Sequence, residues 1–554
     1  MKYSSKLLSQ SLVQICDAKE IHHIVISPGS RNAPLTIGFT ENSKFNNFSI
    51  VDERSAAFFA LGIAQQTKKP VALVCTSGSA MLNYYPAIAE AFYSDIPLVV
   101  ISADRPKELI NIGDGQTIKQ ENVFANHILY SANCKEGDKH LAANENEINK
   151  ALNIVIEQQG PVHINIPLAE PLYKTTEELM VNPSIIPLTN LKQNSFEDLL
   201  PYLNNWNTAK RKIVLVGVMQ PNSVEQELLN KLAEDSSVIV LTETTSNLHH
   251  KNFFSAIDQL IAPLEEDGFE KLKPDILLTF GGMIVSKKIK DFLRKYAPQQ
   301  HWHVDSKKAF DTYFNLKHHF KTTPNKFLKE FLPKTKMVES SYQKDWLKIK
   351  SHRLNRHSKY INEIPFSDFK VFSEIVNILP NNIQLQLSNS ATIRYAQLFN
   401  IDKSIEMFCN RGTSGIDGCT STAIGAAVAS KKPIVFITGD LSFLYDSNAL
   451  WNNYIPDNFK IIVINNGGGG IFRILPGDKN TVNFNTYFET KHQLNASSLA
   501  AMYGFEYTSV KNKNELKATL QEFFKISEKA SILEIFTPSE VNDKVLLDYF
   551  RFIK

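Results

Sequence analysis

The sequence predicts an α/β protein made of three doubly wound parallel-sheet domains in series. Short, strongly apolar strands recur along the chain, and many open into turns rich in glycine, serine or proline. Helical stretches separate consecutive strands, which is typical of a sheet covered by helices on both faces. The 554 residues also exceed what one hydrophobic core supports. We therefore expect domains at residues 1–180, 195–345 and 365–554.

In the first domain, the apolar pattern predicts a helix over residues 53–65 and strands over residues 23–27, 71–76, 98–102 and 162–166. Ligands of parallel sheets bind at the carboxyl ends of the strands. The turns that follow these strands are therefore the first place to look for a site.

Two polar stretches separate the later domains. Residues 174–208 predict a linker, and a lysine-rich connection covers residues 320–365. We expect strands at residues 212–217, 238–241, 275–280 and 301–305 in the second domain, and at 384–388, 432–438 and 460–465 in the third. The third domain should also contain helices over residues 420–430 and 446–454.

Composition excludes several classes of protein. With 43% hydrophobic residues, 21% charged residues and a net charge of +3, nothing points to nucleic acid or an anionic membrane. The five cysteines are widely spaced without a CxxC pair, which indicates reduced intracellular thiols. We find no signal-peptide pattern and no apolar run long enough for a membrane span, so we predict a cytoplasmic protein.

A candidate metal site lies at two strand ends of the third domain. One strand opens into Gly439-Asp440-Leu441-Ser442, and the next, 26 residues after Asp440, opens into Asn465-Asn466 and four glycines. Mg²⁺ prefers a few oxygen ligands plus phosphate oxygens, and glycines let a backbone approach a diphosphate closely. We therefore predict Asp440, Asn466 and the Gly468 carbonyl as metal ligands. Either half alone could be an ordinary tight turn or loop.

This pair resembles the metal-diphosphate signature of thiamine-diphosphate enzymes, GDG followed by NN. The chain departs from that signature at Leu441, where the general pattern has glycine. The resemblance implies thiamine diphosphate with Mg²⁺ or Mn²⁺, because both cations accept these ligands.

Residues 411–418 (RGTSGIDG) form a second glycine-rich turn before a predicted helix. Helix N-termini attract phosphate through free N–H groups and the helix dipole. In the enzymes that it resembles, this segment contacts the cofactor, and a bulky aliphatic residue holds the two rings in a bent conformation. Ile416 occupies that position, although ordinary core packing would also explain it.

Glu53 is the candidate catalytic residue at the other end of the chain. Thiamine diphosphate reacts through a C2 carbanion, which forms only when a carboxylate hydrogen-bonds to the aminopyrimidine ring. The acids of Val51-Asp52-Glu53 lead an almost wholly apolar helix, and this stretch resembles the activating-glutamate segment. The alternative is that Asp52 and Glu53 are merely first-turn acids favoured by the helix dipole.

Further segments identify the chain as a member of the MenD family, the 2-succinyl-5-enolpyruvyl-6-hydroxy-3-cyclohexene-1-carboxylate synthases of menaquinone biosynthesis. The matches lie at residues 27–35 (SPGSRNAPL), 52–61, 101–106, 116–120, 389–394 (NSATIR), 410–418, 439–444 and 465–472. GDLS belongs to that family's own pattern, so Leu441 supports the resemblance. The middle domain contributes little beyond Ser286-Lys287.

The resemblance implies decarboxylation of 2-oxoglutarate and conjugate addition of the product carbanion to isochorismate. These substrates bring up to four carboxylates, which arginine binds well through its planar fork. The implied substrate residues are Ser30, Arg31, Arg105, Gln116, Lys287, Ser390, Arg394, Arg411, Ile471 and Phe472. For each basic residue alone, a surface salt bridge is the alternative.

The resemblance also implies a larger cofactor set and an oligomer. The cofactor residues are Glu53, Ser77, Ser388, Gly412, Ser414, Gly415, Ile416, Asp440, Leu441, Ser442, Asn466, Gly468, Gly469 and Ile471. The implied assembly is a homodimer or homotetramer with its active sites at the subunit interface.

Two alternatives remain open. One is another thiamine-diphosphate 2-oxo-acid decarboxylase or an acetohydroxyacid-synthase-like carboligase. Simple decarboxylases use a His-His pair, but His22-His23 lies at the entrance of a strand rather than in a site loop. The other is a non-enzymatic relative that lost the cofactor, against which the joint presence of Glu53, Asp440 and Asn466 argues.

Overall fold

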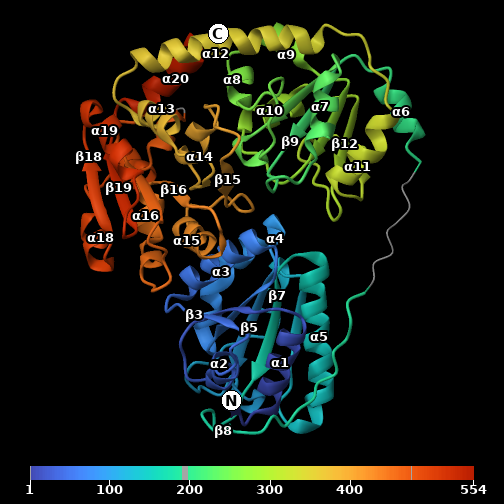
Figure 1. The fold of residues 1–554 in the computed structure, drawn as a ribbon, viewed down its shortest axis with the longest axis vertical. Coiled ribbons are helices and arrows are strands. Elements are labelled where there is room, and N and C mark those ends of the chain that lie inside the picture. The colour runs from blue at the N-terminus through green and yellow to red at the C-terminus, as the bar shows by residue number, and fades with distance from the viewer. Residues whose placement is uncertain (1, 190–197, 476) are drawn as a thin grey trace.

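The computed structural model describes residues 2–189, 198–475 and 477–554 and forms three α/β domains around parallel sheets (Figure 1). The predicted fold class is confirmed. Residues 190–197 of the predicted linker, with the first residues of the predicted 195–345 domain, lie outside the described residues. In Figure 1 the first domain lies below the other two, which are side by side above it.

The first domain contains a six-stranded parallel sheet in the order β3-β2-β4-β5-β7-β6. Its strands are β2 (His23–Ile26), β3 (Asn46–Ser49), β4 (Val71–Cys75), β5 (Leu98–Asp104), β6 (Tyr130–Asn133) and β7 (Val162–Pro167). Its helices are α1 (Leu7–Ala18), α2 (Ala33–Thr40), α3 (Glu53–Thr67), α4 (Tyr85–Ser94) and α5 (Leu141–Gln158). A small antiparallel pair, β1 (Tyr3–Ser4) and β8 (Thr175–Thr176), joins the two ends of this region.

The middle domain contains a five-stranded parallel sheet in the order β10-β9-β11-β12-β13. Its strands are β9 (Lys212–Val216), β10 (Val238–Thr242), β11 (Ile276–Phe280), β12 (Gln300–Val304) and β13 (His318–Phe320). Its helices are α6 (Leu200–Trp206), α7 (Gln226–Glu234), α8 (Ile257–Ile261), α9 (Glu266–Leu272), α10 (Lys287–Lys295) and α11 (Pro324–Phe331).

The polar connection predicted at residues 320–365 is mostly helical. Helix α12 (Tyr342–Glu363) spans the two upper domains along the top of Figure 1. Its buried residues recur at helical spacing on one side, from Tyr342 and Trp346 to Tyr360. The many lysines therefore cover the solvent side of a helix that is apolar along only one stripe.

The third domain contains a six-stranded parallel sheet in the order β15-β14-β16-β17-β19-β18. Its strands are β14 (Gln384–Leu387), β15 (Glu406–Cys409), β16 (Ile434–Gly439), β17 (Lys460–Asn465), β18 (Glu506–Val510) and β19 (Ser531–Phe536). Its helices are α13 (Asp368–Ile378), α14 (Ala391–Ala396), α15 (Cys419–Ala429), α16 (Asp440–Tyr445), α17 (Val482–Phe484), α18 (Ser497–Tyr503), α19 (Lys513–Phe523) and α20 (Asn542–Phe552).

The helix predicted at residues 446–454 is wrong. Helix α16 precedes that segment and ends at Tyr445, and only a 3-10 turn follows, at Ser447–Leu450. The Asp446 carboxylate is turned inward, where it accepts hydrogen bonds from the backbone N–H (2.7 Å) and hydroxyl (2.9 Å) of Ser421. Asp446 thus anchors α15 instead of continuing a helix of its own.

The two six-stranded domains share one topology and pack on each other through equivalent helices. Numbered from β2 and from β14, both sheets follow the order 2-1-3-4-6-5. Helices α3 and α15 each follow the second strand of their sheet, and they cross at Gly62 and Gly425. A Cβ atom would lie 2.1 Å from the Thr422 carbonyl oxygen at Gly62, and 2.0 Å from the Phe59 carbonyl oxygen at Gly425. Only glycine allows the two backbones this approach.

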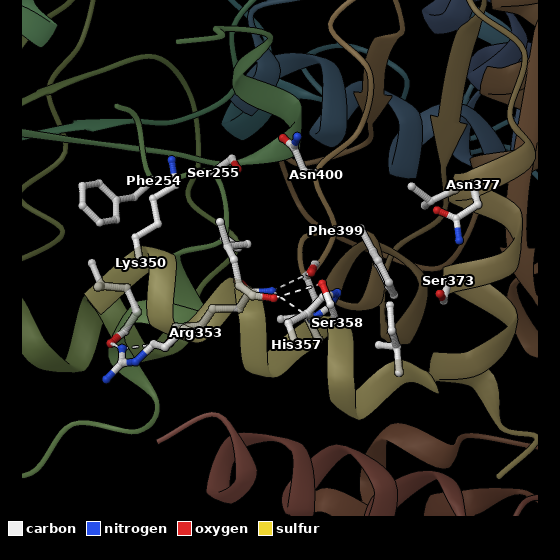
Figure 2. Close-up of a pocket in the computed structure, with 17 residues that line it drawn as sticks. Phe254, Ser255, Lys350, Arg353, His357, Ser358, Ser373, Asn377, Phe399 and Asn400 are labelled. Atoms are coloured by element: carbon white, nitrogen blue, oxygen red, sulfur yellow. Dashed lines mark hydrogen bonds between the residues drawn. The ribbon is translucent and has the colours of Figure 1, made fainter. Parts of the chain in front are cut away.

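A pocket of about 250 Å³ lies where the middle domain, α12 and the third domain meet (Figure 2). Arg353 of α12 donates from Nη1 to the carbonyl oxygens of Gln259 and Leu260 near the C-terminal end of α8. His357 Nδ1, also on α12, lies 2.8 Å from the Tyr549 hydroxyl oxygen. These contacts cap α8 and attach α12 to both neighbouring domains.

The five cysteines are buried free thiols, as the sequence predicts. Of the helices in residues 2–189, 198–475 and 477–554, none is long and apolar enough to cross a membrane.

Candidate functional site

The predicted metal ligands lie at one edge of the third-domain sheet. Strand β16 ends at Gly439, so Asp440 becomes the first residue of α16, and the neighbouring strand β17 ends at Asn465. The strands pair in parallel register with Gly439 opposite Ile464. Asp440 and Asn466 therefore project from adjacent strand ends.

The Asp440 carboxylate faces the glycine loop that follows β17. It is 4% exposed, and its Oδ1 accepts a hydrogen bond of 2.7 Å from the Leu441 backbone N–H. Its Oδ2 accepts one of 2.9 Å from the Gly468 N–H and lies 3.2 Å from His492 Nε2. The neighbouring Asp440 carboxylate raises the pKa of His492 above its ordinary value. The carboxylate is thus fixed in direction while keeping oxygen lone pairs for a cation.

Asn466 presents an uncommitted oxygen beside this carboxylate. Its Nδ2 donates to Asp368 Oδ2 at 2.9 Å, whereas its Oδ1 is buried and has no hydrogen-bond partner within the described residues. At Gly468, φ is 150°, and a Cβ atom would lie 2.5 Å from the Glu489 carbonyl oxygen. A carboxylate, a free amide oxygen and a glycine bend fit a hard divalent cation that takes its other ligands from a diphosphate.

The RGTSGIDG segment is held partly by the first domain. The Glu90 carboxylate of α4 accepts hydrogen bonds from the backbone N–H groups of Gly412 (2.7 Å) and Thr413 (2.6 Å). A Cβ atom at Gly412 would lie 2.5 Å from the Glu90 carbonyl oxygen. This loop therefore requires glycine at a contact between domains. Ser414 follows with a positive φ of 63°.

The rest of that segment is attached to the third-domain sheet. Asn389 Nδ2 donates to the Gly415 carbonyl at 2.7 Å, and Asn389 Oδ1 accepts from Arg411 Nη1 at 2.6 Å. Ser442 Oγ donates to the Ile416 carbonyl at 2.7 Å. Ile416 thereby sits next to α16, the helix that begins at Asp440.

Three further predicted cofactor residues surround this edge. Ser388, which follows β14, is fully buried, and its hydroxyl lies 3.1 Å from the Thr392 hydroxyl. The Gly469 N–H donates to the Glu489 carbonyl at 2.5 Å, and Leu441 is half-buried. These contacts fix the loops while leaving part of the Leu441 side chain exposed.

In the first domain, Glu53 begins α3 and lies half-buried behind its N-cap, Asp52. Burial raises the pKa of the Glu53 carboxyl group above its ordinary value of 4.5. Its one hydrogen-bonded side-chain partner among the described residues is Asn83, whose Nδ2 lies 3.4 Å from Oε2. Ser77, which follows β4, is also buried. Its hydroxyl has no hydrogen-bond partner in the described part of the chain.

A first cationic group lies at the carboxyl edge of the first-domain sheet. Arg31 is only 5% exposed, and its Nη2 lies 3.2 Å from Glu170 Oε1. Burial and then the charge of Arg105 lower the pKa of Arg31, so the two guanidinium groups face one environment. Ser30 precedes Arg31 and is exposed, whereas Gln116 is exposed in the loop that follows β5.

A second cationic group lies in the third domain. Arg394 donates from Nη1 to the Ser390 carbonyl at 2.6 Å, and burial followed by the charge of Arg411 lowers its pKa. Ser390 has an unusual backbone, with φ at 69° and ψ at −124°. Lys287 is exposed at the start of α10.

The apolar wall predicted from the sequence lies in the 3-10 turn Gly470–Ile474. Ile471 is half-buried, and Phe472 is 37% exposed. Both follow the glycine loop of the metal site directly, so the turn places apolar surface next to that loop.

Within one chain, no hydrogen bond or ion pair among the described residues joins Glu53, Arg31 or Arg105 to a predicted site residue of the third domain. Instead, Arg54 Nη2 donates to the Tyr445 carbonyl at 2.8 Å, at the last residue of α16. Asp440 is the first residue of that helix. The residue that follows Glu53 thus contacts the end of α16 opposite to Asp440.

The sequence prediction omitted several residues that hold the site. They are Glu90, Asp368 and His492, together with Asn389 inside the NSATIR segment. Asp368 follows Ser367 at a helix start, which indicates only capping. Their roles depend on contacts between residues far apart in the chain, for which a single sequence carries no signal.

Comparison with known families agrees with this architecture. Residues 7–127 match the model for the N-terminal TPP binding domain of thiamine pyrophosphate enzymes. Residues 190–387 match the middle domain of thiamine pyrophosphate, and residues 390–535 match the C-terminal TPP binding domain.

Among individual proteins, the chain is 59% identical over 554 residues to a 2-succinyl-5-enolpyruvyl-6-hydroxy-3-cyclohexene-1-carboxylate synthase from Flavobacterium psychrophilum, covering all of both chains. A synthase of the same name from Christiangramia forsetii is 59% identical, again over both full lengths. One from Porphyromonas gingivalis is 38% identical over 100% of this chain and 98% of that protein. The chain therefore belongs to the 2-succinyl-5-enolpyruvyl-6-hydroxy-3-cyclohexene-1-carboxylate synthase family of thiamine-diphosphate-dependent enzymes.

Proposed function

We propose that this protein decarboxylates 2-oxoglutarate and adds the resulting four-carbon unit to isochorismate, which gives 2-succinyl-5-enolpyruvyl-6-hydroxy-3-cyclohexene-1-carboxylate and CO₂. The observation that carries the proposal is 59% identity over the full length to relatives named for that product. Two separate groups of arginines at sheet edges provide the chemical support.

When bound, thiamine diphosphate supplies a nucleophilic C2 and an electron sink for decarboxylation. We assign the cation to Asp440, Asn466 and the Gly468 carbonyl, with Mg²⁺ or Mn²⁺ as the metal. The cofactor's other contacts would come from Ser77, Ser388, Gly412, Ser414, Gly415, Ile416, Leu441, Ser442, Gly469 and Ile471. The Asn466 oxygen, which has no partner among the described residues, supports the metal assignment.

Glu53 is assigned as the catalytic acid that faces the cofactor's pyrimidine ring. A carboxylate there accepts a proton at a ring nitrogen and gives it back, so its pKa must lie nearer to that of the ring than a solvated glutamate's does. The burial that raises the pKa of Glu53 has this direction.

The cationic groups are assigned to the four carboxylates of the two substrates. Arg31 and Arg105, with Ser30 and Gln116, form one group; Arg394 and Arg411, with Ser390 and Lys287, form the other. In Arg31, Arg105 and Arg411, the buried Nε atoms have no partner within the described residues, so these guanidinium groups still have donors to offer an anion. Ile471 and Phe472 would pack against the apolar part of a substrate.

We propose that the active site is built by two subunits of a homodimer or homotetramer. The lack of any hydrogen bond or ion pair between Glu53 and the third-domain candidates, among the described residues of one chain, supports this. The domain limits 1–180, 195–345 and 365–554 and the cytoplasmic location stay predictions of the sequence.

The direct test mixes the protein with 2-oxoglutarate, isochorismate, thiamine diphosphate and Mg²⁺. We expect isochorismate to be consumed and CO₂ to be released in equal amounts, and both to stop when a chelator removes the metal. Turnover of pyruvate with no loss of isochorismate would contradict the proposed substrates and favour an acetohydroxyacid-synthase-like reaction.

A further inference from the structure

Two neighbouring asparagines at the end of β17 have opposite hydrogen-bonding states. Asn465 has both ends of its amide engaged, because Nδ2 donates to Glu534 Oε1 at 2.7 Å and Oδ1 accepts from the Gly467 N–H at 3.1 Å. Asn466 has only its nitrogen engaged, by Asp368, and its buried oxygen has no partner among the described residues. The first amide serves the fold, and the second retains an oxygen for a ligand.

Asp368 sits where it can fix the second amide. It is the first residue of α13, is 2% exposed, and receives a hydrogen bond from Thr537 Oγ1 to Oδ1 at 2.5 Å. Its own N–H donates to Asn542 Oδ1 at 2.8 Å. The side chain is thus held from several directions before it meets Asn466.

The chemistry of a carboxylate decides which way the Asn466 amide points. A carboxylate only accepts hydrogen bonds, so the side of the amide that faces Asp368 Oδ2 must be the NH₂ group. The oxygen is then directed away from Asp368. A Cβ atom at Gly470 would lie 3.2 Å from Nδ2 and 3.7 Å from Oδ1, so a larger residue there would press on the amide.

We propose that Asp368 is a positioning residue for the cation of the cofactor site: it orients the Asn466 amide so that Oδ1, rather than the NH₂ group, faces the metal. This inference rests on the metal assignment in the proposed function. Without Asp368 no partner selects the orientation in which Oδ1 faces the metal, and the flipped amide presents an NH₂ group that repels a cation. Partners that orient metal ligands typically contribute about 10- to 100-fold to metal affinity.

The test is the affinity for Mn²⁺, measured by electron paramagnetic resonance in the presence of saturating thiamine diphosphate and without either substrate. We expect Asp368→Leu, which removes the acceptor but keeps the branched shape, to weaken Mn²⁺ binding by about 10- to 100-fold. Asp368→Asn should recover most of this loss, because its amide oxygen accepts from Asn466 while the Thr537 hydroxyl turns to accept from its NH₂ group.

Asp104→Leu is the matched control. Asp104 is also 2% exposed and accepts from an asparagine amide, Asn165 Nδ2, at 2.8 Å, but it lies in the first domain. Asp104→Leu should lower the melting temperature. It should change the affinity for Mn²⁺ by no more than about twofold, as expected for a residue that does not act on the metal site. Equal weakening in both leucine variants would overturn the positioning role and indicate a general loss of stability.

If Asp368→Leu does not fold, Asp368→Ala decides when it is compared in the wild-type and Asn466→Asp backgrounds. A carboxylate at position 466 has an oxygen at either end, so it needs no partner to orient it. The proposal predicts that Asp368→Ala weakens Mn²⁺ binding in the wild-type background but not in Asn466→Asp, and equal weakening in both backgrounds would overturn it. A wild-type protein that binds no Mn²⁺ with thiamine diphosphate would instead refute the metal assignment of the proposed function.

Discussion

The first and third domains are two versions of one fold with different chemistry at their edges. Both have six parallel strands in the order 2-1-3-4-6-5, and their second crossover helices, α3 and α15, pack against each other. In the first domain, the loop after the second strand presents an acid, Glu53. In the third, the equivalent loop is the RGTSGIDG segment, and the acid Asp440 follows the third strand.

The two acids also occupy different environments. Asp440 is 4% exposed and receives backbone hydrogen bonds from Leu441 and Gly468. Glu53 has one long hydrogen bond, from Asn83, and burial raises its pKa. The fold positions a carboxylate in each domain, and the two carboxylates differ in their local hydrogen bonds.

The largest expected effect comes from removing the acid of the first domain. Glu53→Gln should lower kcat by about 10²- to 10⁴-fold, the usual contribution of a group that transfers a proton. The affinity for thiamine diphosphate should change little, because the proposed diphosphate ligands lie in the other domain. Steady-state kinetics and calorimetry measure the two quantities.

The neighbouring acid provides the control for that variant. Asp52→Asn keeps a good N-cap for α3, whose present cap accepts from the Ser55 N–H at 3.0 Å, and should retain near-normal turnover. Normal rates in Glu53→Gln, or equal losses in both variants, would mean that Glu53 is only a first-turn acid.

A smaller effect on activity is expected from Arg394, one of the arginines proposed to bind substrate. Arg394→Lys keeps the charge but loses the planar fork. A charge-assisted hydrogen bond contributes about 1.5–3 kcal/mol, so kcat/KM should fall by about 10- to 100-fold, mainly through KM. Arg551→Lys, at an exposed residue paired with Asp548, should leave both constants unchanged. An unaltered KM in Arg394→Lys would remove Arg394 from the substrate site.

The packing between the two domains gives a prediction about stability. Gly62→Val inserts a side chain where Thr422 backbone atoms lie, and overpacking of this kind costs about 1–3 kcal/mol. The melting temperature should fall by several degrees in thermal unfolding. A Cβ atom at Gly115 would meet no atom of the described chain within 4 Å beyond its immediate neighbours, so Gly115→Ala should melt like the wild type. A tolerant Gly62→Val would show that α3 and α15 are not in tight contact.

The pH dependence gives the smallest and most local signal. Burial raises the pKa of Glu53 above 4.5, and protonation at low pH removes the carboxylate that the reaction needs. The value of kcat/KM should therefore fall on acidification with a midpoint above 4.5, while circular dichroism shows that the fold persists. A midpoint at or below 4.5 would contradict the buried environment of Glu53.

Much of the fold could be predicted from the sequence, and most of the missed strands share a physical cause. Strands β3, β6, β13, β15 and β18 all lie at sheet edges. An edge strand is less covered on one side, and its apolar pattern is shorter. The central strand β19 was also missed. Its apolar run is interrupted by Glu534, which is 1% exposed because Asn465, Ala496 and Tyr507 all donate to its carboxylate.

The candidate site was predictable only where its residues follow strand ends in a recognisable order. Asp440, Asn466 and Gly468 are brought together by adjacent parallel strands, as their spacing indicates. Glu90 and Asp368 could not be found in this way, because they act on segments about 320 and 98 residues away in the chain. Such contacts arise from tertiary packing, which leaves no local pattern.

The two domains each hold one of the two acids, and our central claim is that Glu53 and Asp440 act in one site when they come from different subunits. The direct test combines two inactive variants, Glu53→Gln and Asp440→Ala, by dissociation and reassembly or by co-expression. Random pairing makes half of the dimers mixed, and each mixed dimer has one intact site of two, so activity should return to about a quarter of the wild-type value. Activity that stays at the level of the separate variants would contradict the claim.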